Sequence, residues 1–220
     1  KIQNNYKKIT KLDLSNQNLT SFPDYVFKMT NLRKLILHNN HIGKIPPQIK
    51  TLSKLMVLDL SNNELSAIGY QVLKLPKLKI LNLCYNQIVC LPNGIKEVVI
   101  KQLLLSNNRL SRLNIGGFRK LERLTINNNE LSIVALEGVY PLLKDIWMGN
   151  NPIKRIAITK TNAPTLRGIY TYTYACNIKN VAEDYKSLMS TKGNVIDIFF
   201  GKLKTVNKNV KFKMSIDMNE

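Results

Sequence analysis

The chain has 220 residues, 44% of them hydrophobic, which is enough for a folded protein with a sizeable core. It contains no run of about 18 or more apolar residues, which excludes a membrane-spanning helix. The 33 Lys and Arg against 14 Asp and Glu give a net charge of +19, and the basic residues are spread along the whole chain. This charge favours anionic partners, and a solubilising surface is the alternative interpretation.

Cysteine and histidine usage predicts neither a disulfide scaffold nor a metal centre. The three cysteines, Cys84, Cys90 and Cys176, are an odd number without dense spacing, and we expect reduced thiols. No Cys/His grouping has the spacing of a zinc site, and no Gly-rich phosphate loop, HExxH motif or calcium loop occurs. The sequence therefore predicts no metal and no cofactor.

Residues 1–8 (KIQNNYKK) predict at most a thin amino-terminal cap. After them, seven segments share the spacing apolar-x-x-apolar-x-apolar-x-x-Asn-x-apolar, with Gln17 at the Asn position of the first. They begin at nearly constant intervals, at Ile9, Leu32, Leu55, Leu78, Ile100, Leu121 and Leu143. Residues 9–158 are therefore expected to form one domain of stacked repeats.

Each repeat contains a short strand in which alternate apolar residues, such as Leu58 and Leu60, point to one face. Stacking one strand per repeat predicts a parallel sheet with that face in the core. Because each coil buries apolar surface only against its neighbours, both ends of the stack need caps.

The recurring asparagine is expected to pair the buried backbone groups of the turn that follows each strand. The chain turns there while its backbone polar groups become buried under the next coil, and these groups cannot stay unpaired. A side-chain amide supplies both a donor and an acceptor. We therefore expect a structural ladder of Asn40, Asn63, Asn86, Asn108, Asn129 and Asn151. The asparagines one position earlier, such as Asn62 and Asn107, suit left-handed turn geometry.

A second apolar residue per repeat is expected to fill the convex side of the core. These residues are Phe22, Ile45, Ile68, Leu91, Leu113, Val134 and Ile156. Pro23, Pro46 and Pro92 lie beside three of them and favour irregular turns or short 3₁₀ pieces over full helices.

The motif resembles the leucine-rich repeat family over residues 9–158. Segments such as FPDYVFKMTNL, IPPQIKTLSKL and LPNGIKEVVI resemble the Pro-containing second half of its 22 to 24 residue class. The resemblance implies an α/β solenoid with a curved parallel β-sheet on the concave face. It also implies a mostly irregular or 3₁₀ convex side and a carboxyl-terminal α/β cap.

The segments YPLLKDIWMGNNPI and APTLRGIYTYTYACNI align with Leu143 over Leu166 and Ile146 over Ile169, which predicts a degenerate eighth repeat with Tyr174 at the ladder position. Beyond it, apolar spacing over 181–189 predicts a helix closed by Gly193. NVIDIFFG reads as the next strand, with Ile196 equivalent to Ile169, and alternation over 210–216 predicts a charged edge strand. Residues 159–220 are therefore expected to cap the solenoid, with a separate small domain as the alternative.

Two groups of side chains on the predicted concave face are candidates for partner binding. Trp147, Tyr170 and Tyr172 are expected to cluster at its carboxyl end, where exposed aromatic rings act as interface anchors. The alternative is that the cap folds over them. The second group is an apolar track flanked by two cations, suited to an apolar peptide or helix that bears acidic groups. It comprises Ile36, Val57, Ile80 and Leu104 with Lys34 and Arg123. Scattered surface aliphatics are the alternative interpretation of this group.

A catalytic site is not expected on this face. His38 lies one strand from Ser15 and Ser61, with Asp13 and Asp59 diagonal to it, so a triad could be drawn. Neighbouring strands are about 4.8 Å apart on an open face, with no pocket to exclude water and no oxyanion donors.

The leading hypothesis is therefore a non-enzymatic, monomeric module that binds a protein or peptide through its concave face. The alternative is polyanion binding, to nucleic acid, sulfated glycan or anionic lipid, through the basic surface. An enzyme in residues 160–220 is a third reading. The sequence is compatible with a cytoplasmic protein, or with a secreted or surface protein or effector of a microbe.

Overall fold

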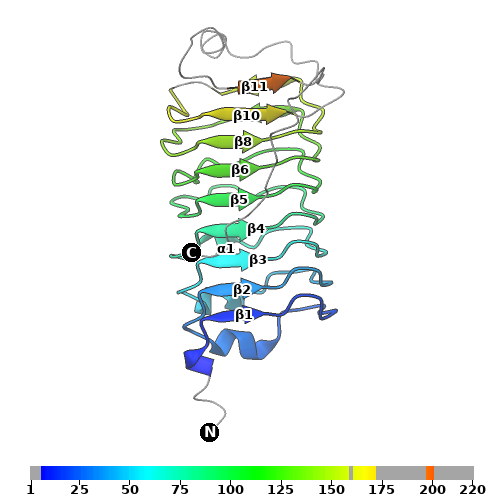
Figure 1. Cartoon of the computed structure of the whole chain (residues 1–220), viewed down its shortest axis with the longest axis vertical. Helices are drawn as coiled ribbons and strands as arrows, with labels where there is room; N and C mark the ends of the chain where they lie inside the picture. The colour runs from blue at the N-terminus through cyan, green and yellow to red at the C-terminus, as the bar shows by residue number, and fades with distance from the viewer. Residues whose placement is uncertain (1–5, 159–160, 172–196, 201–220) are drawn as a thin grey trace, which may run out of the picture.

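The structure is a computed structural model of the chain, and it describes residues 6–158, 161–171 and 197–200. Within these residues the largest sheet has the strand order β1-β2-β3-β4-β5-β6-β8-β10-β11, and every neighbouring pair is parallel (Figure 1). The strands are β1 (Lys11–Asp13), β2 (Lys34–Ile36), β3 (Val57–Asp59), β4 (Ile80–Asn82), β5 (Gln102–Leu104), β6 (Arg123–Thr125), β8 (Asp145–Trp147), β10 (Gly168–Thr171) and β11 (Asp197–Phe200).

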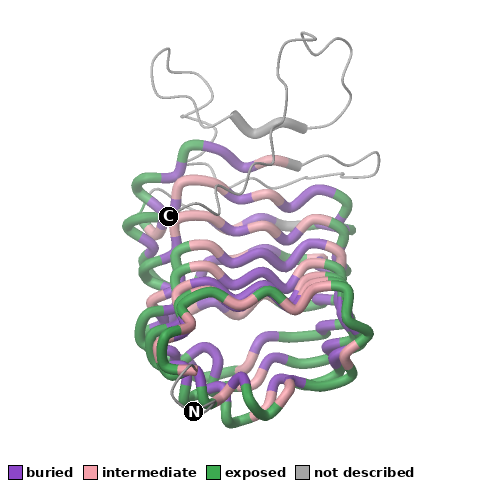
Figure 2. The backbone as a smooth tube through the Cα atoms, turned by 60° about the horizontal axis from the view of Figure 1, so that its bottom comes forward, coloured by how far each residue is buried: buried purple, intermediate pink, exposed green. Residues whose placement is uncertain are grey.

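Each strand is short because it carries only one core residue between two concave-face residues. The central residues pair in register along the sheet, as Leu35 with Leu58 and Leu58 with Leu81. Leu35, Leu58 and Leu81 are fully buried, and buried positions recur at the same place in successive coils (Figure 2). The leucine spacing in the sequence therefore predicted the parallel solenoid correctly.

The convex side is irregular, as the prolines predict. The described residues place 3₁₀ turns at η1 (Tyr6–Lys8), η2 (Asp24–Lys28) and η3 (Pro47–Thr51), and one short helix at α1 (Tyr70–Leu73). Pro23 and Pro46 directly precede η2 and η3 in extended geometry, and their fixed φ suits the entry to a turn.

A second, two-stranded parallel sheet on the convex side was not predicted. It pairs β7 (Ile133–Ala135) with β9 (Arg155–Ala157), and Val134 lies opposite Ile156. Both side chains are buried, as expected of the second apolar set. Because β-branched residues favour extended backbone, these repeats pair as strands where earlier repeats form turns.

The inner asparagines bridge consecutive coils, and Asn86 shows the pattern. Its Nδ2 donates to the carbonyls of Leu60 at 2.9 Å, Leu83 at 3.1 Å and Cys84 at 3.2 Å. Its Oδ1 accepts the backbone N–H of Leu65 at 3.0 Å. Since Leu60 and Leu65 belong to the preceding repeat, one side chain pairs backbone groups of two coils. The equivalent bonds between coils recur at Asn40, Asn63, Asn108, Asn129 and Asn151.

The asparagines one position earlier have positive φ, at 53° for Asn62 and 59° for Asn107, which confirms the predicted left-handed turns. They also form an outer row that the sequence did not reveal. Asn62 Nδ2 donates to Asn39 Oδ1 at 2.5 Å, and Asn128 Nδ2 donates to Asn107 Oδ1 at 2.9 Å. Tyr85 takes the same left-handed position in the fourth repeat, at φ 55°.

The degenerate eighth repeat is confirmed, because Ile169 of β10 pairs with Ile146 and Tyr170 pairs with Trp147. The register predicted for the next strand was wrong, because Ile198 and not Ile196 pairs with Ile169. Moving from one of these isoleucines to the other keeps the same side chains on the same face, so alternation alone could not choose between them. The predicted helix over 181–189, the predicted strand over 210–216, Tyr172, Tyr174 and Cys176 lie outside the described residues.

Candidate functional site

The concave face consists of two columns of side chains on either side of the buried central residues. Strand pairing aligns the first column as Lys11, Lys34, Val57, Ile80, Gln102, Arg123, Asp145 and Gly168. It aligns the second as Asp13, Ile36, Asp59, Asn82, Leu104, Thr125, Trp147 and Tyr170.

An aromatic cluster lies toward the carboxyl-terminal end of this face, and we define it as Arg123, Trp147 and Tyr170. The two rings stack with centroids 4.9 Å apart and an interplanar angle of 13°. The guanidinium carbon of Arg123 lies 5.4 Å from the centroid of the Trp147 ring, within cation–π range. Both rings remain partly exposed, so they offer flat apolar surface to a ligand.

Gly168 positions this stack, and its role was not predicted from the sequence. A Cβ at Gly168 would lie 2.5 Å from Oη and 2.6 Å from Cζ of Tyr170. The missing side chain therefore leaves the space in which the Tyr170 ring lies back toward the start of its own strand. The available signal was a glycine inside a predicted strand, which often marks such a close approach.

Charges beside the rings add polarity to the cluster. Among the described residues, Arg123 Nε is buried without a hydrogen-bond partner. Burial raises the pKa of Asp145, and the cations of Arg123, Arg167 and Lys144 oppose that rise. The guanidinium charge beside the rings favours a ligand that brings an acceptor, such as a carboxylate or a backbone carbonyl.

Three residues of the apolar track are less exposed than a partner-binding surface requires. Ile36, Val57 and Leu104 lie on the concave strands, but only 5% to 6% of each side chain is exposed. Each lies between the side chains of adjacent strands about 4.8 Å away, which leaves little apolar surface for a partner. Ile80 and Lys34 keep intermediate exposure.

The serines near His38 are held by neighbouring carboxylates. Ser15 Oγ donates to Asp13 Oδ1 at 2.6 Å, and Ser61 Oγ donates to Asp59 Oδ1 at 2.7 Å. The hydrogen bond from the Ser15 hydroxyl lowers the pKa of Asp13. These contacts pair each hydroxyl within its own strand-end turn. Across the residues that the structure describes, no three His, Cys, Asp or Glu side chains group as metal ligands.

The two described cysteines are predicted to differ in reactivity. Both are free thiols, but burial raises the pKa of Cys84 to about 11, whereas Cys90 is exposed. The thiolate fraction of Cys84 is thereby reduced about a hundredfold, and the thiolate is the nucleophile. We expect iodoacetamide at mildly alkaline pH to modify Cys90 first, measured by peptide mass spectrometry over time. In guanidinium the two rates should converge, and equal rates in the folded protein would contradict the burial of Cys84.

Cationic side chains gather along the edge of the solenoid where the strands begin. Backbone hydrogen bonds stack the residues just before the strands, as from Met56 N to Arg33 O at 2.7 Å and from Lys101 N to Lys79 O at 2.8 Å. We define the basic edge as Arg33, Lys34, Lys54, Lys77, Lys79, Lys101, Lys120, Arg123, Lys144 and Arg167. The acidic residues within these segments are Glu122 and Asp145, and Glu122 pairs with Lys101 at 2.8 Å and with Lys144 at 3.2 Å.

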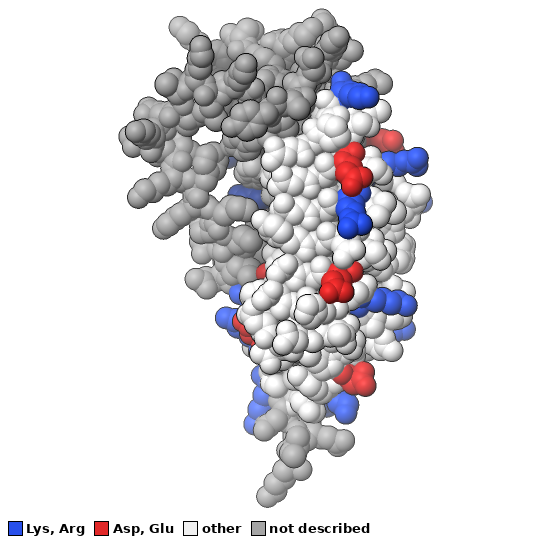
Figure 3. Space-filling view, turned by 90° about the vertical axis from the view of Figure 1, so that its right-hand side faces the viewer, with Lys and Arg blue, Asp and Glu red and all other residues white. Residues whose placement is uncertain are grey.

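The opposite edge, where the strands end in asparagine turns, carries few charges (Figure 3). In the turns that follow β1 to β6 and β8, the charged residues are Glu64, Arg109 and Glu130. The positive charge is therefore spread along the solenoid axis, as the sequence indicates. The strand-start edge carries more of it than the strand-end edge, and further cations such as Lys44, Lys96 and Lys154 lie outside both edges.

The stacked parallel strands, the asparagine ladder and the open concave face define a repeat solenoid of a class that commonly mediates protein interaction. The chain is a leucine-rich repeat protein. A family profile described as "Leucine Rich repeats (2 copies)" matches residues 7–51, and one described as "Leucine rich repeat" matches residues 53–97.

Solved structures of the same fold resemble the chain at low sequence identity. An internalin of Listeria monocytogenes is 20% identical with a TM-score of 0.64, over 84% of this chain and 54% of that one. The LRIM1/APL1C complex is 22% identical with a TM-score of 0.64, over 74% of this chain and 35% of that one. A leucine-rich repeat protein of Leptospira interrogans is 20% identical with a TM-score of 0.58, over 88% of this chain and 61% of that one. The chain thus spans 35% to 61% of the length of these three structures.

No protein of curated function matches the chain in sequence. Within the described residues, no helix has both the length and the apolar character needed to cross a bilayer.

Proposed function

We propose that the chain is a non-enzymatic recognition module that binds a protein or peptide through its concave face. The observation that carries this proposal is the stack of Trp147 on Tyr170 with Arg123 over the indole ring. Leucine-rich repeats commonly mediate protein interactions, and one of the similar structures is itself a complex of two proteins.

The composition of the aromatic cluster suits a binding anchor. Trp, Tyr and Arg are the residues most enriched among those that dominate binding energy at interfaces. The stacked rings hold each other in place, so little side-chain entropy is lost when a ligand packs on them. The guanidinium of Arg123 beside the indole ring places a cation where the ligand can supply an acceptor. A peptide that pairs an apolar side chain with a carboxylate or carbonyl fits these groups.

Replacing Trp147 with Ala is expected to weaken binding by about 2 kcal/mol or more, because the substitution removes the face on which both neighbours pack. The measurement selects peptides from a random library on the purified chain at physiological salt, then determines their affinity by calorimetry. Gly168→Ala is expected to weaken the same peptides, since the new Cβ displaces the Tyr170 ring.

Tyr70→Ala is the matched control, because Tyr70 is an exposed aromatic residue on the convex side. It should leave the affinity unchanged. Peptides that bind the Trp147→Ala and Tyr170→Ala variants as tightly as the original chain would place the recognition site elsewhere.

Polyanion binding is the second candidate function, and the basic edge is the observation that favours it. A line of cations on one side of the molecule can follow a charged polymer, and the low charge of the opposite edge argues against a uniform solubilising coat. Polyanion binding would be distinguished by a steep, linear fall of the logarithm of the affinity with the logarithm of the salt concentration.

A further inference from the structure

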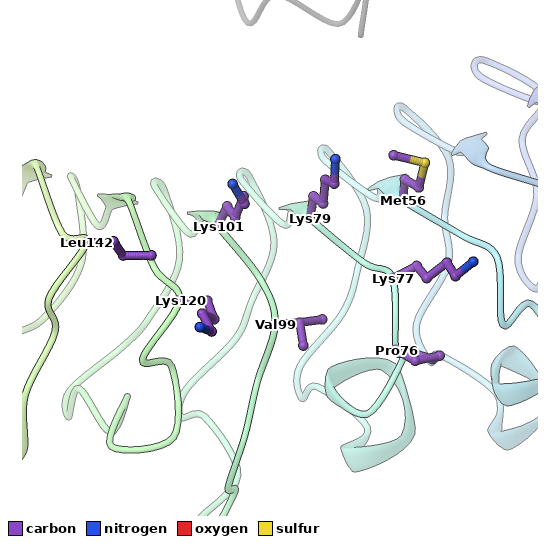
Figure 4. A pocket seen from close by; sticks show the side chains of 8 residues that line it. All are labelled: Met56, Pro76, Lys77, Lys79, Val99, Lys101, Lys120 and Leu142. Atoms are coloured by element: carbon purple, nitrogen blue, oxygen red, sulfur yellow. The ribbon is translucent and has the colours of Figure 1, made fainter.

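A shallow groove runs along the basic edge between consecutive coils, and its lining is half apolar (Figure 4). Met56, Val99 and Leu142 contribute aliphatic surface, and Leu142 is 38% exposed. Lys77, Lys79 and Lys120 are exposed and contribute ammonium groups around that surface. The groove lies on the strand-start edge, outside the aromatic cluster.

This arrangement costs stability in the isolated chain. Lys79, Lys101 and Lys120 precede the consecutive strands β4, β5 and β6. Because adjacent coils are about 4.8 Å apart, their like charges repel each other. Glu122 offsets part of this repulsion through Lys101 and Lys144. Lys77, Lys79 and Lys120 are not among the ion pairs of the described residues. An anionic ligand with apolar side chains would relieve the repulsion and cover the aliphatic surface at the same time.

We propose that this groove binds an extended acidic segment of a protein partner, in which carboxylates alternate with aliphatic side chains. From Met56 before β3 to Leu142 before β8 the groove crosses four strand intervals, about 19 Å at ~4.8 Å each. An extended peptide rises about 3.3 Å per residue, so about six residues fill this length. Alternation places its apolar side chains against the groove and its carboxylates beside the lysines.

The lining favours this occupant over nucleic acid. Single strands gain much of their binding energy by stacking bases on aromatic rings, and the groove lining is aliphatic and cationic. A duplex would place phosphates against Met56, Val99 and Leu142 and leave this apolar surface without an apolar partner. Lysines act as point charges and accept carboxylates in many geometries, which suits a segment defined by its pattern.

The proposal does not rest on the concave-face function, because the groove and the aromatic cluster use different side chains. The probe is a fluorescein-labelled peptide of alternating Glu and Leu, about eight residues long. Its binding to the full chain is measured by fluorescence anisotropy at physiological salt. We expect the triple variant Lys77→Glu/Lys79→Glu/Lys120→Glu to bind at least about tenfold more weakly. Trp147→Ala should leave the affinity unchanged, so failure of one proposal does not imply failure of the other.

Two controls separate the groove from charge alone. Lys44→Glu/Lys96→Glu/Lys154→Glu changes the net charge equally at exposed sites away from the basic edge, and it should retain affinity within about twofold. Met56→Ser/Leu142→Ser leaves the charge unchanged, and it should weaken the Glu-Leu peptide about fivefold or more by removing apolar contact. Circular dichroism melting of each variant confirms folding, and Lys79→Glu alone serves as the milder variant.

The proposal is overturned if the Glu-Leu peptide does not bind, or if the control triple reversal weakens binding as much as the groove reversal. It is also overturned if a Glu-Ser peptide of equal charge binds as tightly as the Glu-Leu peptide. A DNA duplex that binds with steep salt dependence and is insensitive to Met56→Ser/Leu142→Ser would instead identify the basic edge as a polyanion site.

Discussion

Replacing Asn86 with Ala is expected to lower the free energy of unfolding by about 2 to 3 kcal/mol. Its side chain is 9% exposed and pairs the carbonyls of Leu60, Leu83 and Cys84 and the N–H of Leu65. Alanine removes all four of these hydrogen bonds. The Leu65 N–H is left unpaired, which costs about 1 to 3 kcal/mol. The carbonyls of Leu60, Leu83 and Cys84 each keep one hydrogen bond, from Asn63 Nδ2, Asn108 Nδ2 and the Asn62 N–H.

Urea denaturation followed by circular dichroism measures the change as a lower midpoint. The matched control is Gln87→Ala, because Gln87 is the exposed neighbour of Asn86 and is expected to change stability by less than about 0.5 kcal/mol. Since contacts in a solenoid are made between adjacent repeats, the loss should appear first around the fourth repeat, as faster amide exchange at Leu65. An Asn86→Ala variant as stable as Gln87→Ala would mean that the ladder does not hold the coils together.

The features predicted from sequence are those that repeat. Leu58 and Leu60 recur with Asn63 at a fixed spacing, and each set meets its equivalents in the next coil because the period is nearly constant. Strand position, register and the buried second apolar set follow from that period alone, without knowledge of a distant contact. The predicted register was wrong where the period changed, because Ile198 follows Ile169 by 29 residues, whereas the central residues of the earlier paired strands are 21 to 23 residues apart.

The features that could not be predicted depend on how side chains of adjacent repeats lie together. The burial of Ile36, Val57 and Leu104 depends on packing between adjacent strands, which the pattern does not encode. The role of Gly168 depends on the conformation of one tyrosine ring.

The basic edge could not be predicted from the sequence for a different reason. Its lysines and arginines occupy several positions of the repeat and are separated in sequence by charged residues of other faces. Charge counted along the chain is therefore uniform, whereas charge counted around the solenoid axis is not. The second candidate function gained support only when the coils were stacked.

The adjacent glycines Gly116 and Gly117 are expected to respond very differently to substitution with alanine. A Cβ at Gly117 would lie 2.1 Å from the backbone oxygen and 2.7 Å from the backbone carbon of Ile95. These atoms belong to the preceding coil and cannot rotate away as a side chain would. Gly117 also accepts the N–H of Val98 at 3.0 Å, so moving the two coils apart breaks a hydrogen bond. Overpacking of this kind costs about 3 kcal/mol, and Gly117→Ala should lower the free energy of unfolding by that amount.

Gly116→Ala is the matched control, because its nearest contact would be the backbone oxygen of Glu137 at 3.7 Å, an ordinary van der Waals distance. It is expected to be neutral or slightly stabilising, since alanine restricts the unfolded chain more than glycine does. Differential scanning calorimetry of both variants measures the contrast. Equal melting temperatures would show that the coils around Ile95 can separate without cost, which would also contradict tight nearest-neighbour packing as the source of solenoid stability. A large drop for Gly117→Ala alone would place that packing at the backbone contact between the two coils.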